Sequence, residues 1–275
     1  MFNSALCSED MYFEWNGMKF KNYDANDWSS KMLGAGRAMQ KRIRKIVRTK
    51  FPIVPGIFRN FIYLFKSDPT QCGEHKFLAE IFPNPCRGTY IEIGAFHPIY
   101  LSNSIYFKRK GWVGTSFDPN PDFQILWQLF RRGDRFVNKV VTPLRSNSGF
   151  SQFFFMERGI DATSSLIESH AARHSGRFGI TYRSEYVPSI SIEEVLKNFV
   201  DEFGDRPDLL LVDVEGMDNA ILQAICGLQN SSLLPKWIFM EVLDGKTEEA
   251  ILMSREKYQF LDSVGPNILM SLKTS

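Results

Sequence analysis

YIEIGAFHP, residues Tyr90–Pro98, is a short apolar strand that runs into a glycine turn. Strand and helix patterns alternate from this point. Residues 102–110 read as a helix stopped by Gly111, residues 113–117 as a second strand, and residues 123–130 as a second helix. Strands separated by single helices pair in parallel through right-handed crossovers. The sequence therefore predicts an α/β fold with a doubly wound, mostly parallel, Rossmann-like sheet.

The alternation continues toward the C-terminus. We expect a third strand at residues 135–141 and an extra strand at residues 150–156. A capping box at Ser191–Glu194 opens a helix that extends to about Phe203. The remaining predicted elements are strands at 209–214, 237–242, 258–261 and 268–272, with helices at 216–226 and 247–257 between them.

The composition is that of an ordinary globular protein. The chain has 275 residues, of which 44% are hydrophobic and 23% charged, and these values exclude intrinsic disorder and a disulfide-stabilised miniature. The four cysteines form no CxxC pair, a pattern typical of a reducing compartment, so we expect a cytoplasmic protein. We expect neither a cleaved signal peptide nor a membrane-spanning segment.

The N-terminal part differs in charge from the rest. The net charge is +2, yet residues 37–66 carry nine basic side chains and no acidic one. Apolar residues at helical spacing, beginning with Met39 and Ile43, accompany them. We therefore divide the chain into a basic and aromatic accessory region, 1–75, and a domain with the alternating pattern, 76–275. The basic segment is open to three interpretations, which are a solvated helix face, contact with an anionic membrane and docking on the second domain; its apolar stripe argues against nucleic-acid binding.

Acidic residues follow several of the predicted strands. They are Glu92 within the first strand, Asp118 after the second, Asp213 and Glu215 after the fourth, and Glu241 at the end of the fifth. The carboxyl ends of parallel strands form the ligand-binding edge of such sheets. Because an unpaired buried carboxylate costs several kcal/mol or more, this set favours a functional site over structural filler.

The glycine turn limits the choice of cofactor. A dinucleotide oxidoreductase needs G-x-G-x-x-G, but Phe96, His97 and Pro98 stand where the later glycines would be. A nucleotide-binding oxidoreductase is thus the weaker alternative, and a non-catalytic binding scaffold is a second one. The topology without a phosphate cradle, but with an acid such as Asp118 for a ribose, suits S-adenosylmethionine.

Five motifs occur in order along the chain: YIEIGAFHP (90–98), SNS (102–104), KGWVG (110–114), DPNP (118–121) and DLLLVDVEG (208–216). Together they resemble the FkbM family of S-adenosylmethionine-dependent O-methyltransferases. The sequence departs from the family at Glu92, where Asp is more usual, and at Ser191 and Ile192. The resemblance implies methyl transfer to a hydroxyl group of a sugar, glycan or natural product.

The resemblance, together with the chemistry of the residues, gives candidate roles. Binding of S-adenosylmethionine is assigned to Glu92, Gly94, Ala95, Asp118 and Asn120. Catalysis is assigned to Asp213, Glu215 and His97. Asp213 and Glu215 lie two apart on an extended segment, hence on one face, where one can orient the acceptor and the other remove its proton. The same pair could hold a divalent cation, but we predict no metal site.

Two further features are less specific. His170 and His174 share one helical face, but the sequence offers no third ligand for zinc. Residues 158–183 carry many hydrogen-bond donors and are interpreted either as a lid over the acceptor or as plain surface.

Overall fold

The computed structural model describes residues 12–15, 18–21, 70, 72–83, 87–156, 161–243 and 245–273. The chain divides into two compact units, Met1–Phe65 and Lys66–Ser275. In the first unit, β1 (Tyr12–Trp15) and β2 (Met18–Lys21) form an antiparallel pair. The predicted basic segment, 37–66, lies outside the described residues.

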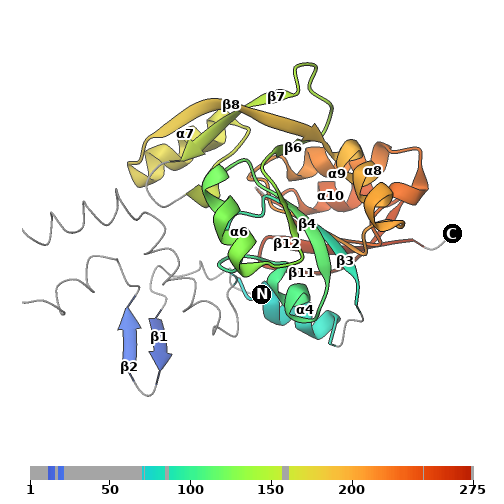
Figure 1. Ribbon diagram of the computed structural model, residues 1–275, viewed down its shortest axis with the longest axis horizontal. Helices are drawn as coiled ribbons and strands as arrows, with labels where there is room; N and C mark the ends of the chain where they lie inside the picture. The colour runs from blue at the N-terminus through green and yellow to red at the C-terminus, as the bar shows by residue number, and fades with distance from the viewer. Residues whose placement is uncertain are drawn as a thin grey trace, which may run out of the picture. The chain divides into compact units, whose positions relative to one another are not determined.

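The second unit is built on a seven-stranded sheet with the order β11-β12-β10-β9-β3-β4-β5. Five neighbouring strands are parallel: β3 (Thr89–Ile93), β4 (Val113–Phe117), β5 (Arg135–Val137), β9 (Leu209–Val212) and β10 (Trp237–Glu241). The hairpin of β11 (Tyr258–Val264) and β12 (Asn267–Leu272) pairs antiparallel with β10. This is the predicted fold, a doubly wound and mostly parallel sheet (Figure 1).

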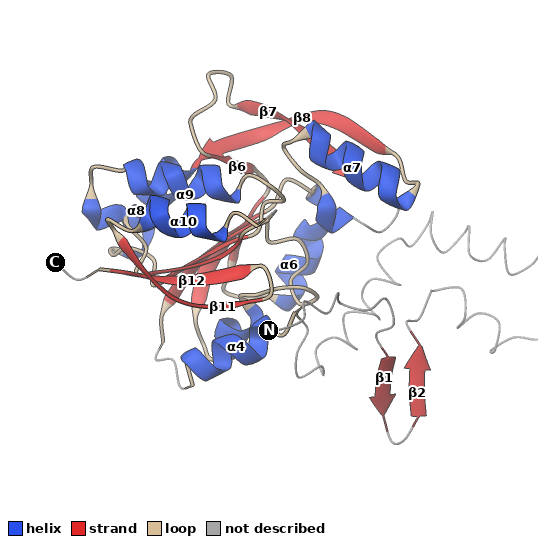
Figure 2. Cartoon of the chain, turned by 180° about the vertical axis from the view of Figure 1, so that it is seen from behind, coloured by secondary structure: helices blue, strands red, loops and turns tan. Residues whose placement is uncertain are grey.

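Helices cover both faces of the sheet. The helices on one face are α8 (Ile192–Phe203), α9 (Asp218–Gly227) and α10 (Thr247–Ser254), and α4 (Glu74–Ile81) lies on the other (Figure 2). The short helix α5 (Ile105–Arg109) packs on the same side as α4. Consecutive residues of β3 face opposite sides of the sheet. Ile91 packs with α8 and α9, whereas Tyr90 packs with α4 and α5.

A second, smaller sheet contains part of a segment predicted as one strand. The single strand predicted for residues 135–141 is wrong: β5 ends at Val137, and the Lys139 N–H donates to the Val137 carbonyl in a tight turn. The chain then enters β6 (Val140–Thr142), which pairs with β8 (Tyr182–Ser191), and β8 also pairs with β7 (Phe150–Met156). All three residues of β6 are buried, Val140 among residues of the smaller sheet and Val141 in the core of the larger one.

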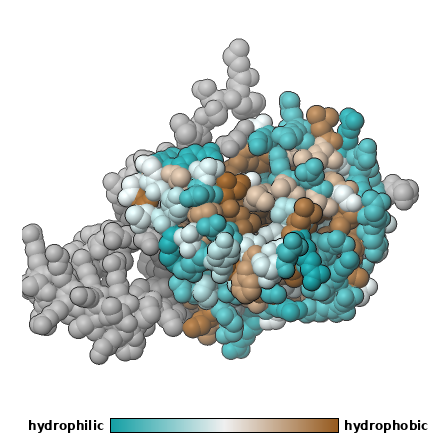
Figure 3. All heavy atoms as spheres, turned by 90° about the horizontal axis from the view of Figure 1, so that it is seen from above, coloured by the Kyte–Doolittle hydropathy of each residue, from teal (hydrophilic) through white to brown (hydrophobic). Residues whose placement is uncertain are grey.

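The smaller sheet also carries α7 (Glu168–Phe178), within the segment interpreted as a lid. Two 3-10 turns, η1 (Pro121–Phe123) and η2 (Asp161–Thr163), precede α6 (Gln124–Phe130) and α7, and a third, η3 (Ser231–Leu233), leads to β10. Figure 3 views the molecule from the side of this sheet, and the surface on that side shows apolar residues among hydrophilic ones.

A buried arginine next to α6 ties the helix to β3 and to the loop that follows it. Arg131 is 1% exposed, and its guanidinium donates to the carboxylate of Asp134 at 2.8 Å, to the Pro98 carbonyl at 2.7 Å and to the Tyr90 hydroxyl at 2.6 Å. It also donates to the hydroxyl of Ser104. A buried cation is stable only when its charge and its donors are satisfied in this way.

Removing this charge should destabilise the fold strongly. We expect Arg131→Met to lower the free energy of unfolding by about 3–5 kcal/mol, because Glu92 is left buried without its cation and Asp134 keeps only its ion pair with Lys108. Urea denaturation followed by circular dichroism measures the change. Arg132→Met, at an exposed neighbouring position, is the matched control. Equal midpoints for the two variants would contradict the structural role of Arg131.

Candidate active site

The strand order reverses between β3 and β9, and the chain is most tightly packed at this point. Gly94, directly after β3, has a φ of +77°, and a Cβ atom placed on it would lie 1.7 Å from the carbonyl oxygen of Asp213. Only glycine fits such an approach of two backbones. In open α/β sheets the crevice at this reversal is where ligands bind.

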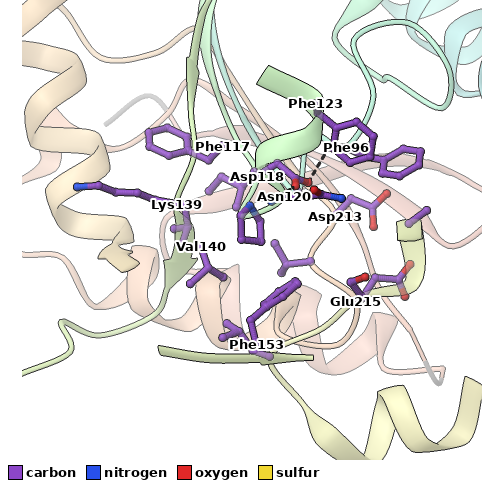
Figure 4. A pocket seen from close by; sticks show the side chains of 18 of the residues that line it. Phe96, Phe117, Asp118, Asn120, Phe123, Lys139, Val140, Phe153, Asp213 and Glu215 are labelled. Atoms are coloured by element: carbon purple, nitrogen blue, oxygen red, sulfur yellow. Dashed lines mark hydrogen bonds between the residues drawn. The ribbon is translucent and has the colours of Figure 1, made fainter. Parts of the chain in front are cut away.

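A cavity that is open to solvent lies at this edge of the sheet. Phe117, Val140 and Phe153 lie on one side of it, and the carboxylates of Asp213 and Glu215 lie on the other (Figure 4). We call this the first cavity. Five of the residues predicted from the sequence line it: Gly94, Asp118, Asn120, Asp213 and Glu215.

Asp118 holds the backbone around the first cavity. One carboxylate oxygen accepts the Phe96 N–H at 2.9 Å and the other accepts the Asn120 N–H at 2.8 Å. Asn120 in turn caps η1 by accepting the Asp122 N–H at 3.0 Å. Asp118 therefore joins the loop after β3 to the turn after β4, and it remains 9% exposed at the cavity wall.

Three predicted site residues line neither this cavity nor the second one described below. Glu92 is buried, and its carboxylate accepts the Ser104 hydroxyl at 2.7 Å and the Ser116 hydroxyl at 3.3 Å. His97 is also buried, and its Nδ1 accepts the N–H groups of Ile99 and Tyr100. Ala95 is 3% exposed and donates its N–H to the Phe117 carbonyl. In the structure these three residues make hydrogen bonds within the chain, and their assignment to the site stays a prediction.

A second cavity adjoins the first and is strongly acidic. It shares Gly94, Phe96, Ala162, Asp213 and Glu215 with the first cavity. The residues that it adds are Cys72, Glu74, Leu101, Asn103, Glu241, Pro266 and Asn267. The position of Glu241 at the end of a strand was visible in the sequence, but it was not assigned to the site.

Glu74 is the residue that the sequence analysis missed. It belongs to α4, which spans the boundary drawn at residue 75, and its carboxylate accepts from the Cys72 N–H and the Asn267 amide. No local motif marks it, because only the packing of α4 against the sheet brings it to this edge.

The carboxyl groups at this edge hold protons that isolated carboxyls would release. Burial, with the charges of neighbouring acids, raises the pKa of Glu241 to about 8. Burial and the charge of Glu241 likewise raise the pKa of Asp213. Because two neighbouring buried carboxylates repel each other, the pair retains one proton near neutral pH.

The backbone is strained around the same cavities. Phe96, Leu101 and Glu215 have φ values of 44°, 59° and 51°, and they are the only described non-glycine residues with positive φ. All three line the second cavity. Each such residue costs about 1–3 kcal/mol, and strain of this kind concentrates at functional sites.

Residues 92–265, more than half of the chain, match the family described as the methyltransferase FkbM domain. The chain belongs to the FkbM methyltransferase family. It is a methyltransferase, and S-adenosylmethionine is its cofactor. No curated protein matches the sequence.

Two solved structures are similar to this chain. A 1,6-didemethyltoxoflavin N1-methyltransferase from Burkholderia thailandensis, solved with S-adenosylhomocysteine, is 14% identical, with a TM-score of 0.38 and coverage of 98% of this chain and 100% of that one. A TehB-like methyltransferase from Corynebacterium glutamicum is 10% identical, with a TM-score of 0.39 and coverage of 80% of this chain and 96% of that one.

The residues present fit this cofactor. Close backbone packing at Gly94 leaves no room for a side chain, an acid stands at the end of β4, and the apolar side of the first cavity suits a flat base. The acidic side suits the positive sulfonium and ammonium groups. Glu241 Oε2 is buried without a hydrogen-bond partner among the described residues, and a donor on a bound ligand would satisfy it.

Asp118 is expected to contribute to cofactor affinity. Asp118→Asn should weaken binding of S-adenosylhomocysteine by about 10- to 100-fold, because a charged hydrogen bond is worth roughly 1.5–3 kcal/mol. Isothermal calorimetry measures the dissociation constant. Asp122→Asn, at an exposed position in the same turn, should bind like the wild type. Unchanged affinity in Asp118→Asn would place the ribose elsewhere.

The raised pKa of Glu241 predicts a dependence of stability on pH. The folded protein binds this proton up to about pH 8, whereas the unfolded chain releases it near the ordinary carboxyl value of about 4.3. The stabilisation is therefore complete at acid pH and is lost as the pH rises toward 8. We expect the free energy of unfolding to fall by a few kcal/mol, on the order of 3, across this window.

Glu241→Gln should remove most of this fall, because an amide does not titrate. Urea denaturation at a series of pH values measures it, and Glu249→Gln, which changes an exposed acid, should keep the wild-type slope. Parallel pH curves for the wild type and Glu241→Gln would show that Glu241 ionises normally.

Proposed function

We propose that this methyltransferase transfers a methyl group to a hydroxyl of a sugar, glycan or other polyhydroxylated acceptor. The observation that carries the proposal is the pair of Asp213 and Glu241, which retains one proton and lies between the glycine turn and the acidic second cavity. A base whose pKa lies near the working pH is suited to removing a proton from a hydroxyl.

The first cavity supplies the cofactor site in this proposal. Asp118 accepts the ribose hydroxyls, the side with Phe117 and Val140 holds the adenine, and the acidic side attracts the methionine ammonium. When bound, S-adenosylmethionine supplies an already activated methyl group. The chain itself therefore has to position the acceptor and remove one proton from its hydroxyl group.

The second cavity supplies the acceptor site. Asp213 lines both cavities, so a hydroxyl bound in the second one lies beside the group that takes its proton. Glu241 holds the proton that the pair already carries, so Asp213 is the ionised group that takes the proton of the hydroxyl, and Glu215 orients the acceptor. Asn103 and Asn267 add amide groups to the wall. A wall of carboxylates and amides favours neutral, hydroxyl-rich acceptors and repels acidic ones.

The cellular location of the protein and its contact with a membrane also belong to the proposal. Among the described residues, no helix has the length and hydrophobicity that a membrane crossing needs. We propose a cytoplasmic enzyme whose basic segment, 37–66, contacts an anionic membrane surface, and this proposal is supported by the charge distribution of the sequence.

Methyl transfer tests the proposal. Radiolabelled S-adenosylmethionine and a panel of neutral sugars, glycans and hydroxylated natural products should identify an acceptor. Asp213→Asn and Glu241→Gln should then lower kcat by about 100-fold, because the proton acceptor is lost, while affinity for S-adenosylhomocysteine changes little. Asp262→Asn, at an exposed position, controls for the substitution itself.

Two results would count against this assignment. Rates within a few-fold of wild type in both variants would exclude the carboxyl pair as the base. Cofactor binding without transfer to any hydroxylated acceptor would favour the binding scaffold considered above.

A further inference from the structure

Two histidines and a glutamate meet at the edge of the active site. His170 and His174 are one turn apart on α7, with ring centroids 4.5 Å from each other. Glu215 reaches them from the loop after β9, and one ligand atom of each residue lies within 4.8 Å of the others. The sequence offered only the two histidines, because Glu215 is distant along the chain.

Two ring nitrogens at this cluster have no hydrogen-bond partner among the described residues. His170 is 3% exposed, and its Nε2, like Nδ1 of His174, is buried without a hydrogen-bond partner among the described residues. The Nε2 atom of His170 lies 3.0 Å from a carboxylate oxygen of Glu215, but the contact lacks hydrogen-bond geometry. Buried polar atoms without partners are rare in folded proteins, so two at one place call for a common ligand.

An ion pair alone does not account for the arrangement. A pair between His170 and Glu215 needs only one histidine, yet the ring of His174 lies beside that of His170 and offers a second nitrogen to the same place.

The surrounding loop fixes Glu215 at this place. Its φ is 51°, and Gly216 follows with a φ of 102°. Ser165 donates its hydroxyl to the Glu215 carbonyl at 2.8 Å, and Asp218 accepts the Gly216 N–H at 3.0 Å. Two side chains thus hold the loop in a conformation that non-glycine residues rarely adopt, and the carboxylate of Glu215 is presented to α7.

We propose that His170, His174 and Glu215 bind a divalent transition-metal ion. Two imidazoles and one carboxylate are a donor set of zinc and non-haem iron sites, whereas Mg²⁺ and Ca²⁺ prefer oxygen ligands alone. Bonds of about 2.0–2.2 Å place tetrahedral ligand atoms roughly 3.3 Å apart, so small side-chain rotations close the cluster around an ion.

The ion would lie at the edge of both cavities, because Glu215 lines each of them. Three protein ligands leave a coordination position for water or for another oxygen. A role in binding the acceptor hydroxyl rests on the proposed function, but the metal site itself does not. A bound cation would also offset the concentration of carboxylates at this edge.

Metal binding by the full chain tests the proposal. The metal-free protein should bind one Zn²⁺ per chain in competition with a chromogenic chelator, and Mg²⁺ should not displace it. His170→Gln, His174→Gln and Glu215→Gln should each weaken Zn²⁺ binding by about 100-fold or more, because each removes one of three ligands. Co²⁺ should bind without thiolate charge-transfer absorption, which excludes the cysteines as ligands.

His75→Gln is the matched control, since His75 is a histidine of α4 outside the cluster. It should bind Zn²⁺ like the wild type. Circular dichroism and thermal melting establish that the variants are folded, and His174, the less buried histidine, gives the safer substitution. A wild type that binds no Zn²⁺, or folded His170→Gln and His174→Gln proteins that bind it unchanged, would overturn the proposal.

Binding of S-adenosylhomocysteine by the same wild-type protein separates the two proposals. Zn²⁺ binding without S-adenosylhomocysteine binding would support the metal site and count against the cofactor site. Cofactor binding without Zn²⁺ binding would do the reverse.

Discussion

The buried guanidinium of Arg131 is the interaction on which the cofactor side of this protein depends. Its charge is compensated by Asp134 and by the nearby Glu92, and its donors reach Tyr90 of β3 and the Pro98 carbonyl of the following loop. One side chain therefore fixes a strand and a loop at once. A buried ion of this kind tolerates little rearrangement, because any broken contact leaves a charge or a donor unpaired in the interior.

Because the loop after β3 is fixed in this way, the protein does not need a glycine-rich turn there. Trp127 of α6 donates to the Phe96 carbonyl at 3.1 Å, and Asp118 accepts the Phe96 N–H, so both polar groups of that residue are held. Side chains thus impose the positive φ of Phe96 that glycine would otherwise allow. The result is a preorganised wall beside Gly94, which needs no reorganisation when a ligand binds.

The opposite wall differs, because negative charge is concentrated on it. Glu74, Asp213, Glu215 and Glu241 come from three separate segments and converge on the second cavity. Such a group is stabilised by shared protons or by cations. Three features offset this negative charge. They are the proton held by Asp213 and Glu241, the positive charge of the cofactor and the metal ion proposed at Glu215.

The sequence by itself determined the fold class, the capping box at Ser191, the family and the acids at the strand ends, because these depend on periodicity and on short motifs. Tertiary structure decided the rest. It divided the strand predicted at 135–141, gave the buried Glu92 and His97 their hydrogen-bond donors, and brought Glu74 and the histidines of α7 to the active-site edge. Those outcomes depend on which surfaces pack together and on where buried charges find partners, and local sequence does not encode contacts between segments that lie far apart in the chain.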